Sequence, residues 1–122
     1  MKATVMSALS IILTVPLLLE FVFAPFNLWT GRTMDNFVRF TGWSPRVATT
    51  LFAPVKLATA VVLAVGLFLR GPSIAGAALS LAISLVYLVR LAHPRRRDGA
   101  GLAGFTLSGA LAAALLVVDL VA

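Results

Sequence analysis

Three ionisable side chains, Glu20, Lys56 and Asp119, stand inside long apolar runs of this chain. Charged groups within a membrane span are energetically expensive and commonly mark a functional site. Glu20 lies ten positions before Thr30, and Lys56 lies ten positions after Arg46, on either side of one polar loop. If the two runs are antiparallel helices, both side chains sit roughly 15 Å from that loop. We therefore predict an ion pair or a shared polar cavity between Glu20 and Lys56 near the middle of the membrane.

The sequence leaves two interpretations of this pair open. A buried ion pair can merely fix the register of two helices. The same two groups can instead form the polar centre of a site, with Glu20 and Lys56 as its candidate catalytic residues. Pro16, Pro25 and Pro54 lie within five residues of one or the other. Because each proline leaves a backbone carbonyl one turn earlier without its helical partner, this concentration of prolines favours a cavity.

Further polar side chains are expected around the mouth of such a cavity, on the side of the loop. The candidate ligand-binding residues are Asn27, Arg32, Asp35, Arg46, Arg90 and His93. His93, the only histidine, equally fits a surface position stabilised by a helix C-terminus. With one histidine and no cysteine, the chain offers no metal or haem site of the usual kind, and no cofactor is evident. Asp119 is expected to form a simple surface pair with Lys2 or Arg70.

The elements that position these residues are predicted to be membrane-spanning helices. Of the 122 residues, 61% are hydrophobic and 11% are charged, whereas soluble domains average about 45–50% and about 25%. The mean hydropathy is +1.05. Each of four apolar runs reaches the roughly 20 residues that a spanning helix needs; they cover about 3–29, 47–69, 73–92 and 101–121. We predict an all-α bundle of four transmembrane helices in a single domain, 1–122, whose first run is a retained helix rather than a cleaved signal peptide.

The connections between the runs refine this architecture. In the loop from Thr30 to Arg46, aromatic residues alternate with arginines, which predicts a short amphipathic segment at the membrane interface. Ser44 and Pro45 are typical of the start of the second helix. The Gly-Pro pair within Arg70–Ser73 predicts a tight turn before the third helix, and the two prolines of the first run predict a tilt, a kink or a re-entrant end.

The net charge of +6 is explained by membrane topology rather than by nucleic-acid binding. Loops 1 and 3 lie on one side of a four-helix protein. They carry seven arginines, while the opposite side carries Lys2 and Arg70. The positive-inside rule then predicts a multi-pass protein of the cell (inner) membrane, with loops 1 and 3 in the cytoplasm. The seven arginines are Arg32, Arg39, Arg46, Arg90, Arg95, Arg96 and Arg97.

Small residues recur at a spacing of four in the last two runs. The two rows are Gly76, Ser80 and Ser84, and Gly104, Ser108 and Ala112. Residues four apart share one face of a helix, and small residues let helices approach closely in lipid. We expect the two rows to face each other or another close helix, and a homo-oligomer face is the alternative.

The overall layout resembles the DoxX-like family of small four-helix membrane proteins, over roughly Leu17 to Asp98. The resemblance rests on NLWTG and FTGWSPR in the first loop, PVKLATAVVLAVGLFLRGP through the second helix, and LVRLAHPRRRDG at the end of the third. Family members often carry a lysine in the first loop and a glutamate in helix 2. Here Asn27 and Leu28 replace the former, and Lys56 stands about where that glutamate is expected. Some relatives are membrane subunits of quinone-linked assemblies such as thiosulfate:quinone oxidoreductase, so the resemblance implies a quinone and an oxidoreductase partner.

Three functions follow as hypotheses. The first is an accessory protein embedded in the lipid bilayer. It binds a lipophilic small molecule, with a quinone as the candidate, and supports a membrane oxidoreductase complex. The second is a stand-alone isomerase or cyclase that acts on a lipophilic substrate with Glu20 as general acid and base. The third is a small proton-coupled transporter, which ranks last because Lys56 at the same depth would suppress cation binding at Glu20.

Overall fold

The computed structural model describes residues 2–92 and 99–121, with side chains from residue 8 onward. Within these ranges the chain is helical and has no strand. The elements are α1 (Lys2–Trp29), α2 (Met34–Thr41), α3 (Pro45–Val47), a π-helical turn (Ala48–Phe52), α4 (Ala53–Gly66), α5 (Arg70–Leu91) and α6 (Gly99–Val121). Four helical stretches are long and apolar enough to span a membrane: Ala8–Trp29, Pro45–Gly66, Arg70–Leu91 and Gly99–Val121. The predicted all-α bundle of four spans is confirmed, and the chain has the architecture of a multi-pass membrane protein.

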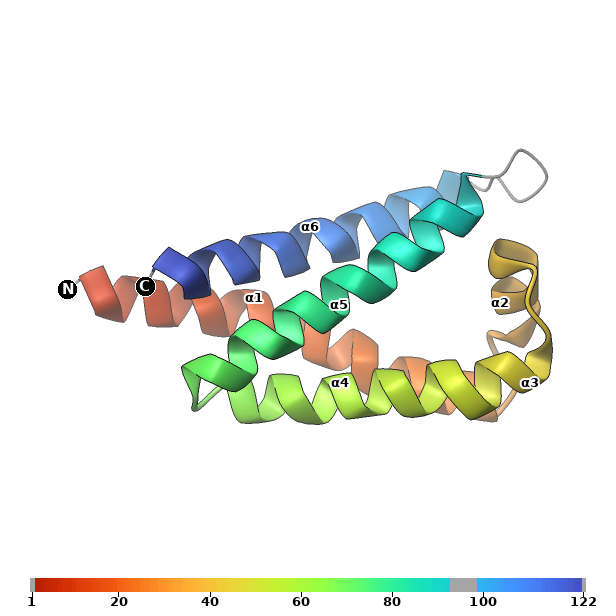
Figure 1. The fold of residues 1–122 in the computed structure, drawn as a ribbon, viewed down its shortest axis with the longest axis horizontal. Helices are drawn as coiled ribbons and strands as arrows, with labels where there is room; N and C mark the ends of the chain where they lie inside the picture. Colours follow the sequence, from red (N-terminus) through yellow and green to blue (C-terminus); the bar gives the residue numbers. More distant parts are fainter. Residues whose placement is uncertain (1, 93–98, 122) are drawn as a thin grey trace.

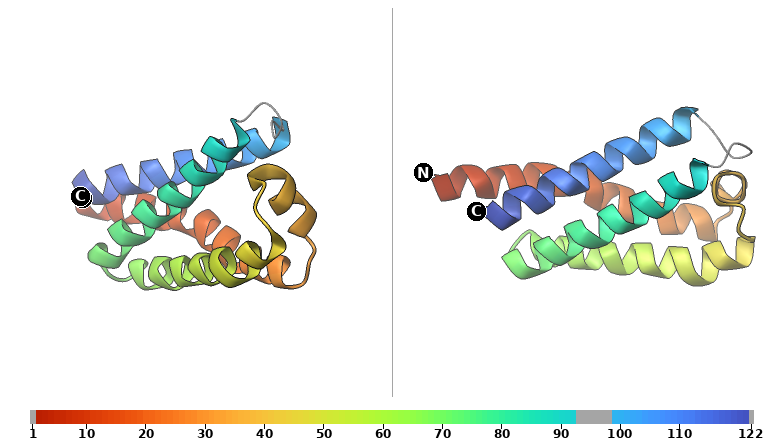
Figure 2. Two further views of the ribbon diagram at one scale, coloured as in Figure 1. Left: turned by 45° about the vertical axis from the view of Figure 1, so that its right-hand side comes forward. Right: turned by 45° about the horizontal axis from the view of Figure 1, so that its top comes forward.

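The four long helices form two pairs that spread apart toward one end (Figure 1). α1 packs along α4, and α5 packs along α6, with further contacts between α4 and α5 and between α1 and α6. Both chain termini lie at the end where the pairs come together, and α2 lies across the end where they separate (Figure 2). The molecule therefore has a closed end and a splayed end, and the short helix α2 occupies the splayed one.

The first helix keeps its continuity across both of its prolines. Pro16 and Pro25 lie inside α1, and the helix bends along its length instead of breaking (Figure 2). A proline removes one backbone hydrogen bond and crowds the preceding turn, so a bend is the expected response. The bend carries the second half of α1 away from α6 and toward α4, and thereby opens the splayed end.

The turn between α4 and α5 lies three residues earlier than the sequence indicated. α4 ends at Gly66 rather than at 69, and α5 begins at Arg70 rather than at 73, so the Gly-Pro pair belongs to the first turn of α5. Pro72 is tolerated there because the first backbone N–H groups of a helix have no helical partner to lose. The backbones of the two helices approach closely at this break, where a β-carbon on Gly66 would lie 2.6 Å from the Ser73 Cα.

The first loop folds largely as predicted. Its amphipathic segment is α2, with Phe37 buried and Asp35 exposed. Glycines in the left-handed conformation flank it, Gly31 with φ 82° and Gly42 with φ 72°, and these turn the chain into and out of the short helix. α3 begins at Pro45 after an extended Ser44, as the Ser-Pro pair predicted.

The small-residue rows meet only in part. Ser84 donates a hydrogen bond to Ser108 with an Oγ–Oγ distance of 3.2 Å, which joins α5 to α6. Gly76 instead faces α4, where a β-carbon would lie 2.8 Å from Leu63 Cδ2. Gly104 is exposed, and a β-carbon there would have no neighbour within 4 Å. The expectation that Gly104 mediates close packing is wrong, because this face of α6 borders open space and not another helix.

Asp119 is not a surface carboxylate. It is 4% exposed and accepts hydrogen bonds from Ser10 Oγ of α1, at 2.9 Å, and from Ser73 Oγ of α5. Arg70 does not pair with the carboxylate but donates its Nε to the Asp119 backbone carbonyl at 2.8 Å. The expected surface pairing is therefore corrected to a buried junction of three helices, and the side chain of Lys2 lies outside the described residues.

The close approach of α4 and α5 predicts that alanine substitution affects stability differently at Gly66 and at Gly104. Gly66→Ala should lower the free energy of unfolding by about 1–3 kcal/mol, because the new methyl group meets the Ser73 backbone. Gly104→Ala should be neutral or slightly stabilising, because the position is open and alanine favours helix. Thermal unfolding of both variants in mild detergent checks this, and equal stabilities would contradict the packing at Gly66.

The Asp119 junction predicts non-additive stability changes. Asp119→Ala should destabilise by about 1–3 kcal/mol, because it removes the acceptor of two serine hydroxyls. Ser10→Ala should cost less in the Asp119→Ala background than in the native chain. A double-mutant cycle measured by unfolding in detergent tests the contact, and strictly additive effects would show that the two side chains do not interact.

Candidate functional site

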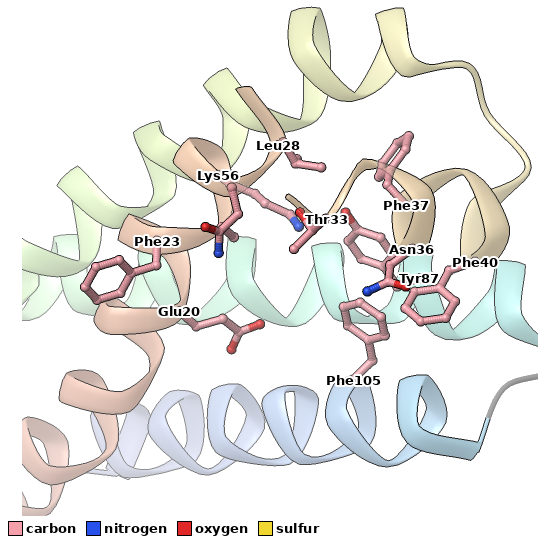
Figure 3. Close-up of a pocket in the computed structure, with 12 residues that line it drawn as sticks. Glu20, Phe23, Leu28, Thr33, Asn36, Phe37, Phe40, Lys56, Tyr87 and Phe105 are labelled. Atoms are coloured by element: carbon pink, nitrogen blue, oxygen red, sulfur yellow. The ribbon is translucent and has the colours of Figure 1, made fainter. Parts of the chain in front are cut away.

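A cavity of about 320 Å³ lies within the splayed end of the bundle (Figure 3). All four long spans contribute to it, together with α2 and the residues just before it. The lining residues are Glu20, Phe23, Ala24, Asn27 and Leu28 of α1, Thr33, Asn36, Phe37 and Phe40 in and before α2, Lys56 of α4, Tyr87 of α5 and Phe105 of α6. The cavity is thus mainly apolar and aromatic, with a few polar groups that converge on it.

Glu20 and Lys56 both line this cavity, from α1 and α4 (Figure 3). Within the described part of the chain no hydrogen bond or direct ion pair joins them, and their charges interact across the space. Of the two arrangements that the sequence predicted, the geometry corresponds to the shared cavity and not to the ion pair. The equal spacing of both residues from the first loop is what brings them to the same level.

The Glu20 carboxylate is held by a chain of hydroxyl groups. Ser108 Oγ lies 2.8 Å from one carboxylate oxygen and 3.1 Å from the other, and it donates to this group. Ser84 Oγ donates in turn to Ser108. Three spans are therefore linked through hydroxyls to one carboxylate. The serines also leave lone pairs of the carboxylate facing the cavity, because a single hydroxyl proton cannot occupy all of them.

Lys56 lies in a different environment from Glu20. Its side chain is only 8% exposed, while Glu20 is exposed. The Lys56 ammonium sits 4.4 Å from the centre of the Tyr87 ring, a cation–π contact of the kind that stabilises a desolvated ammonium. Lys56 thus forms the deep wall of the cavity, and Glu20 lies toward its open side.

The aromatic wall of the cavity comes from three separate elements. Tyr87 and Phe105 stack with ring centroids 4.2 Å apart and an interplanar angle of 5°. Phe37 meets Tyr87 edge to face at 6.2 Å, and Phe40 meets Phe105 in the same way at 6.1 Å. Tyr87 and Phe105 were not among the predicted site residues. An aromatic residue in an apolar span carries no local signal of its partner on another helix.

A second hollow of about 460 Å³ adjoins the first on the side of α6. It shares Glu20, Asn36, Phe40 and Phe105 with the first, and its other lining residues are Arg39, Ala100, Gly101 and Gly104. This explains the exposure of Gly104, since an open space replaces the expected helix contact. The two hollows therefore meet at Glu20 and its neighbours, with Lys56 in the first and the start of α6 in the second.

The expected ligand-binding residues are distributed unevenly around this site. Asn27 lines the cavity. Arg32, Asp35 and Arg46 are exposed and are not among the lining residues of either hollow, which differs from the prediction. They lie in or next to surface turns whose path could not be read from the sequence. His93 lies outside the described residues.

Arg90 has a structural partner instead of a place in the cavity. Its Nε donates to the Thr41 carbonyl at 2.7 Å, and its guanidinium stacks over the Trp43 ring at 4.5 Å. These contacts hold the segment after α2 against the end of α5. The polar residues on the loop side that do line the cavity, Thr33 and Asn36, were not singled out, because only the path of the chain into α2 turns them inward.

The described residues hold no group of three or more histidine, cysteine, aspartate or glutamate side chains that could bind a metal ion.

No family model, curated protein sequence or solved structure shows significant similarity to this chain. The resemblance to DoxX-like proteins therefore remains a prediction from the residues. Fold and site together define a class: a helical membrane protein with four candidate spans and an amphiphilic cavity at one end.

The separation of Glu20 and Lys56 predicts a weak energetic coupling. A buried pair in direct contact loses about 3–5 kcal/mol when one partner is removed. Because these two groups face each other across a cavity, the coupling energy from Glu20→Gln, Lys56→Met and the double variant should be about 0.5–1 kcal/mol. Unfolding in detergent measures it, and a value of 3 kcal/mol or more would show a direct ion pair.

Proposed function

We propose that this protein binds a lipophilic small molecule with a polar head group in the cavity between α1, α2, α4, α5 and α6. Small-molecule sites are typically concave and largely apolar, with a few polar groups that orient the ligand. This cavity has that composition, because aromatic side chains surround one ammonium, one carboxylate and the amides of Asn27 and Asn36. The single observation that carries the proposal is the convergence of Glu20 and Lys56 on one cavity.

The position of the cavity favours a ligand that partitions into the bilayer. Eight of its twelve lining residues come from apolar spans, and Phe23 of α1 in its lining is 60% exposed. A molecule dissolved in lipid could reach this opening from the side, with its head group at Glu20 and Lys56 and its tail toward the hydrocarbon. A water-soluble substrate would gain little from so apolar a wall.

A quinone is the first candidate within this class. Each quinone carbonyl can accept a hydrogen bond from an ammonium such as that of Lys56, and its planar ring suits the aromatic surface of Tyr87 and Phe105. The resemblance to DoxX-like proteins points to the same ligand and to a role beside a membrane oxidoreductase.

With loops 1 and 3 on the cytoplasmic side of the cell membrane, the cavity would open toward the cytoplasmic half of the bilayer.

Binding of decylubiquinone tests this proposal. Quenching of tryptophan fluorescence should saturate with the native protein, because Trp43 packs on Phe52 beside the cavity wall. Lys56→Met should weaken binding at least tenfold, which corresponds to roughly 1.4 kcal/mol. Arg32→Gln is the matched control and should bind normally, since Arg32 lies outside the cavity lining.

Native mass spectrometry of protein extracted in mild detergent complements the titration, because it reports bound molecules and oligomeric state together. A lipophilic adduct that is present in the native protein and absent from Lys56→Met would support the proposal. Unsaturable quenching together with no adduct would contradict it, as would equal affinities of the native protein and Lys56→Met.

A further inference from the structure

The Lys56 side chain is largely buried, and its ammonium reaches the cavity without an acceptor among the described residues. Among the described residues its only direct contact of a polar or aromatic kind is the face of the Tyr87 ring at 4.4 Å. An ammonium has three N–H donors, and a ring face occupies one direction. The side chain is 92% buried, so the cavity is where its ammonium can be reached, and this points to an acceptor supplied by a ligand in the cavity.

The charges that line the cavity limit which kind of acceptor group can bind at Lys56. Glu20 on the opposite wall balances the charge of Lys56, so the cavity has no net charge to attract an anion. A neutral acceptor attached to an apolar body fits both walls, and a carbonyl group is the simplest one. Carbonyl compounds can also react further, because a lysine in a hydrophobic pocket is the side chain that forms imines with them.

We infer that Lys56 is a covalent site for lipophilic aldehydes, with Glu20 as its proton acceptor and donor; the inference rests on the proposed ligand-binding cavity. The Lys56 ammonium loses one proton, which reaches the Glu20 carboxylate on the opposite wall of the cavity through one intervening water molecule, and the amine nitrogen then bonds to the carbonyl carbon. The carbonyl oxygen becomes a hydroxyl by taking a proton from that nitrogen. Glu20 returns its proton to the hydroxyl, which leaves as water. The product is an iminium whose positive charge the Glu20 carboxylate balances.

The side chains around the cavity suit these roles, with Lys56 and Glu20 on opposite walls of one space. The aromatic wall of Phe37, Tyr87 and Phe105 shelters the nitrogen and provides an apolar surface for the aldehyde chain. Ser108 and Ser84 orient the carboxylate without consuming all its lone pairs. Asn27 and Asn36 offer further amide groups at the cavity wall for the departing water. No comparable arrangement surrounds Asp119, whose carboxylate is occupied by two serines.

Reductive trapping tests this inference in the intact protein. Decanal and sodium cyanoborohydride are added to the protein in mild detergent, and alkylated lysines are located by peptide mass spectrometry. The sequence contains one other lysine, Lys2, which serves as an internal reference. We expect Lys56 to be alkylated at least tenfold faster in the folded protein than in protein denatured with dodecyl sulfate. Alkylation of Lys2 alone, or equal rates for Lys56 in both states, would overturn the inference.

Matched carboxylate variants test the part assigned to Glu20. Glu20→Gln should slow alkylation of Lys56 at least tenfold and leave Lys2 unchanged, whereas Asp119→Asn, which alters the carboxylate outside the cavity, should leave both unchanged. An equal rate in Glu20→Gln and the native protein would overturn the proton-transfer role. Decylubiquinone should slow the trapping at Lys56 by competition. Saturable quinone binding without any trapping would overturn only the covalent site and leave the proposed function standing.

Discussion

A polar group inside an apolar span must find its partner within the protein, and this constraint organises the described structure. Thr14, Thr59 and Ser80 are buried, and each returns its hydroxyl to a carbonyl one turn earlier in its own helix. Asp119 receives two serine hydroxyls from two other helices. Against this background of satisfied groups, the Lys56 ammonium stands out because a ring face is its only partner there.

The helices pack through small residues at one end of the bundle and through large aromatic residues at the other. At the closed end, Gly66 and Ser73 let the backbones of α4 and α5 touch, and Asp119 ties α1, α5 and α6 together. At the splayed end, large rings separate the helix pairs: Phe37, Phe52 and Tyr87 form one buried cluster. Small residues bring helices together and aromatic residues hold them apart, so the cavity lies where the side chains are largest.

The short helix α2 covers the space between the separated helix pairs and so completes the wall of the cavity. Without it, the gap between the helix pairs would be an open groove. Phe37 of α2 packs on Phe52 and Tyr87, and Arg90 holds the segment that follows the helix. α2 thereby covers the cavity from the loop side and adds Asn36 and Phe40 to its lining. On the side of α1, where the surrounding hydrocarbon would lie, the lining residues Glu20 and Phe23 are exposed.

Composition and run length alone determined that this is a four-span helical protein, because an apolar stretch of about 20 residues has few other folds open to it. Counting along the chain also placed Glu20 and Lys56 at one level, since helical rise is constant. Only the tertiary structure decided that they face a cavity and not each other, that Tyr87 and Phe105 form its wall, and that Asp119 is buried. These features depend on how α1 bends and how far the helix pairs spread, which no single helix encodes. For the same reason Arg32, Asp35 and Arg46 were assigned to the cavity, whereas Thr33 and Asn36 are the polar residues of the first loop and α2 that line it.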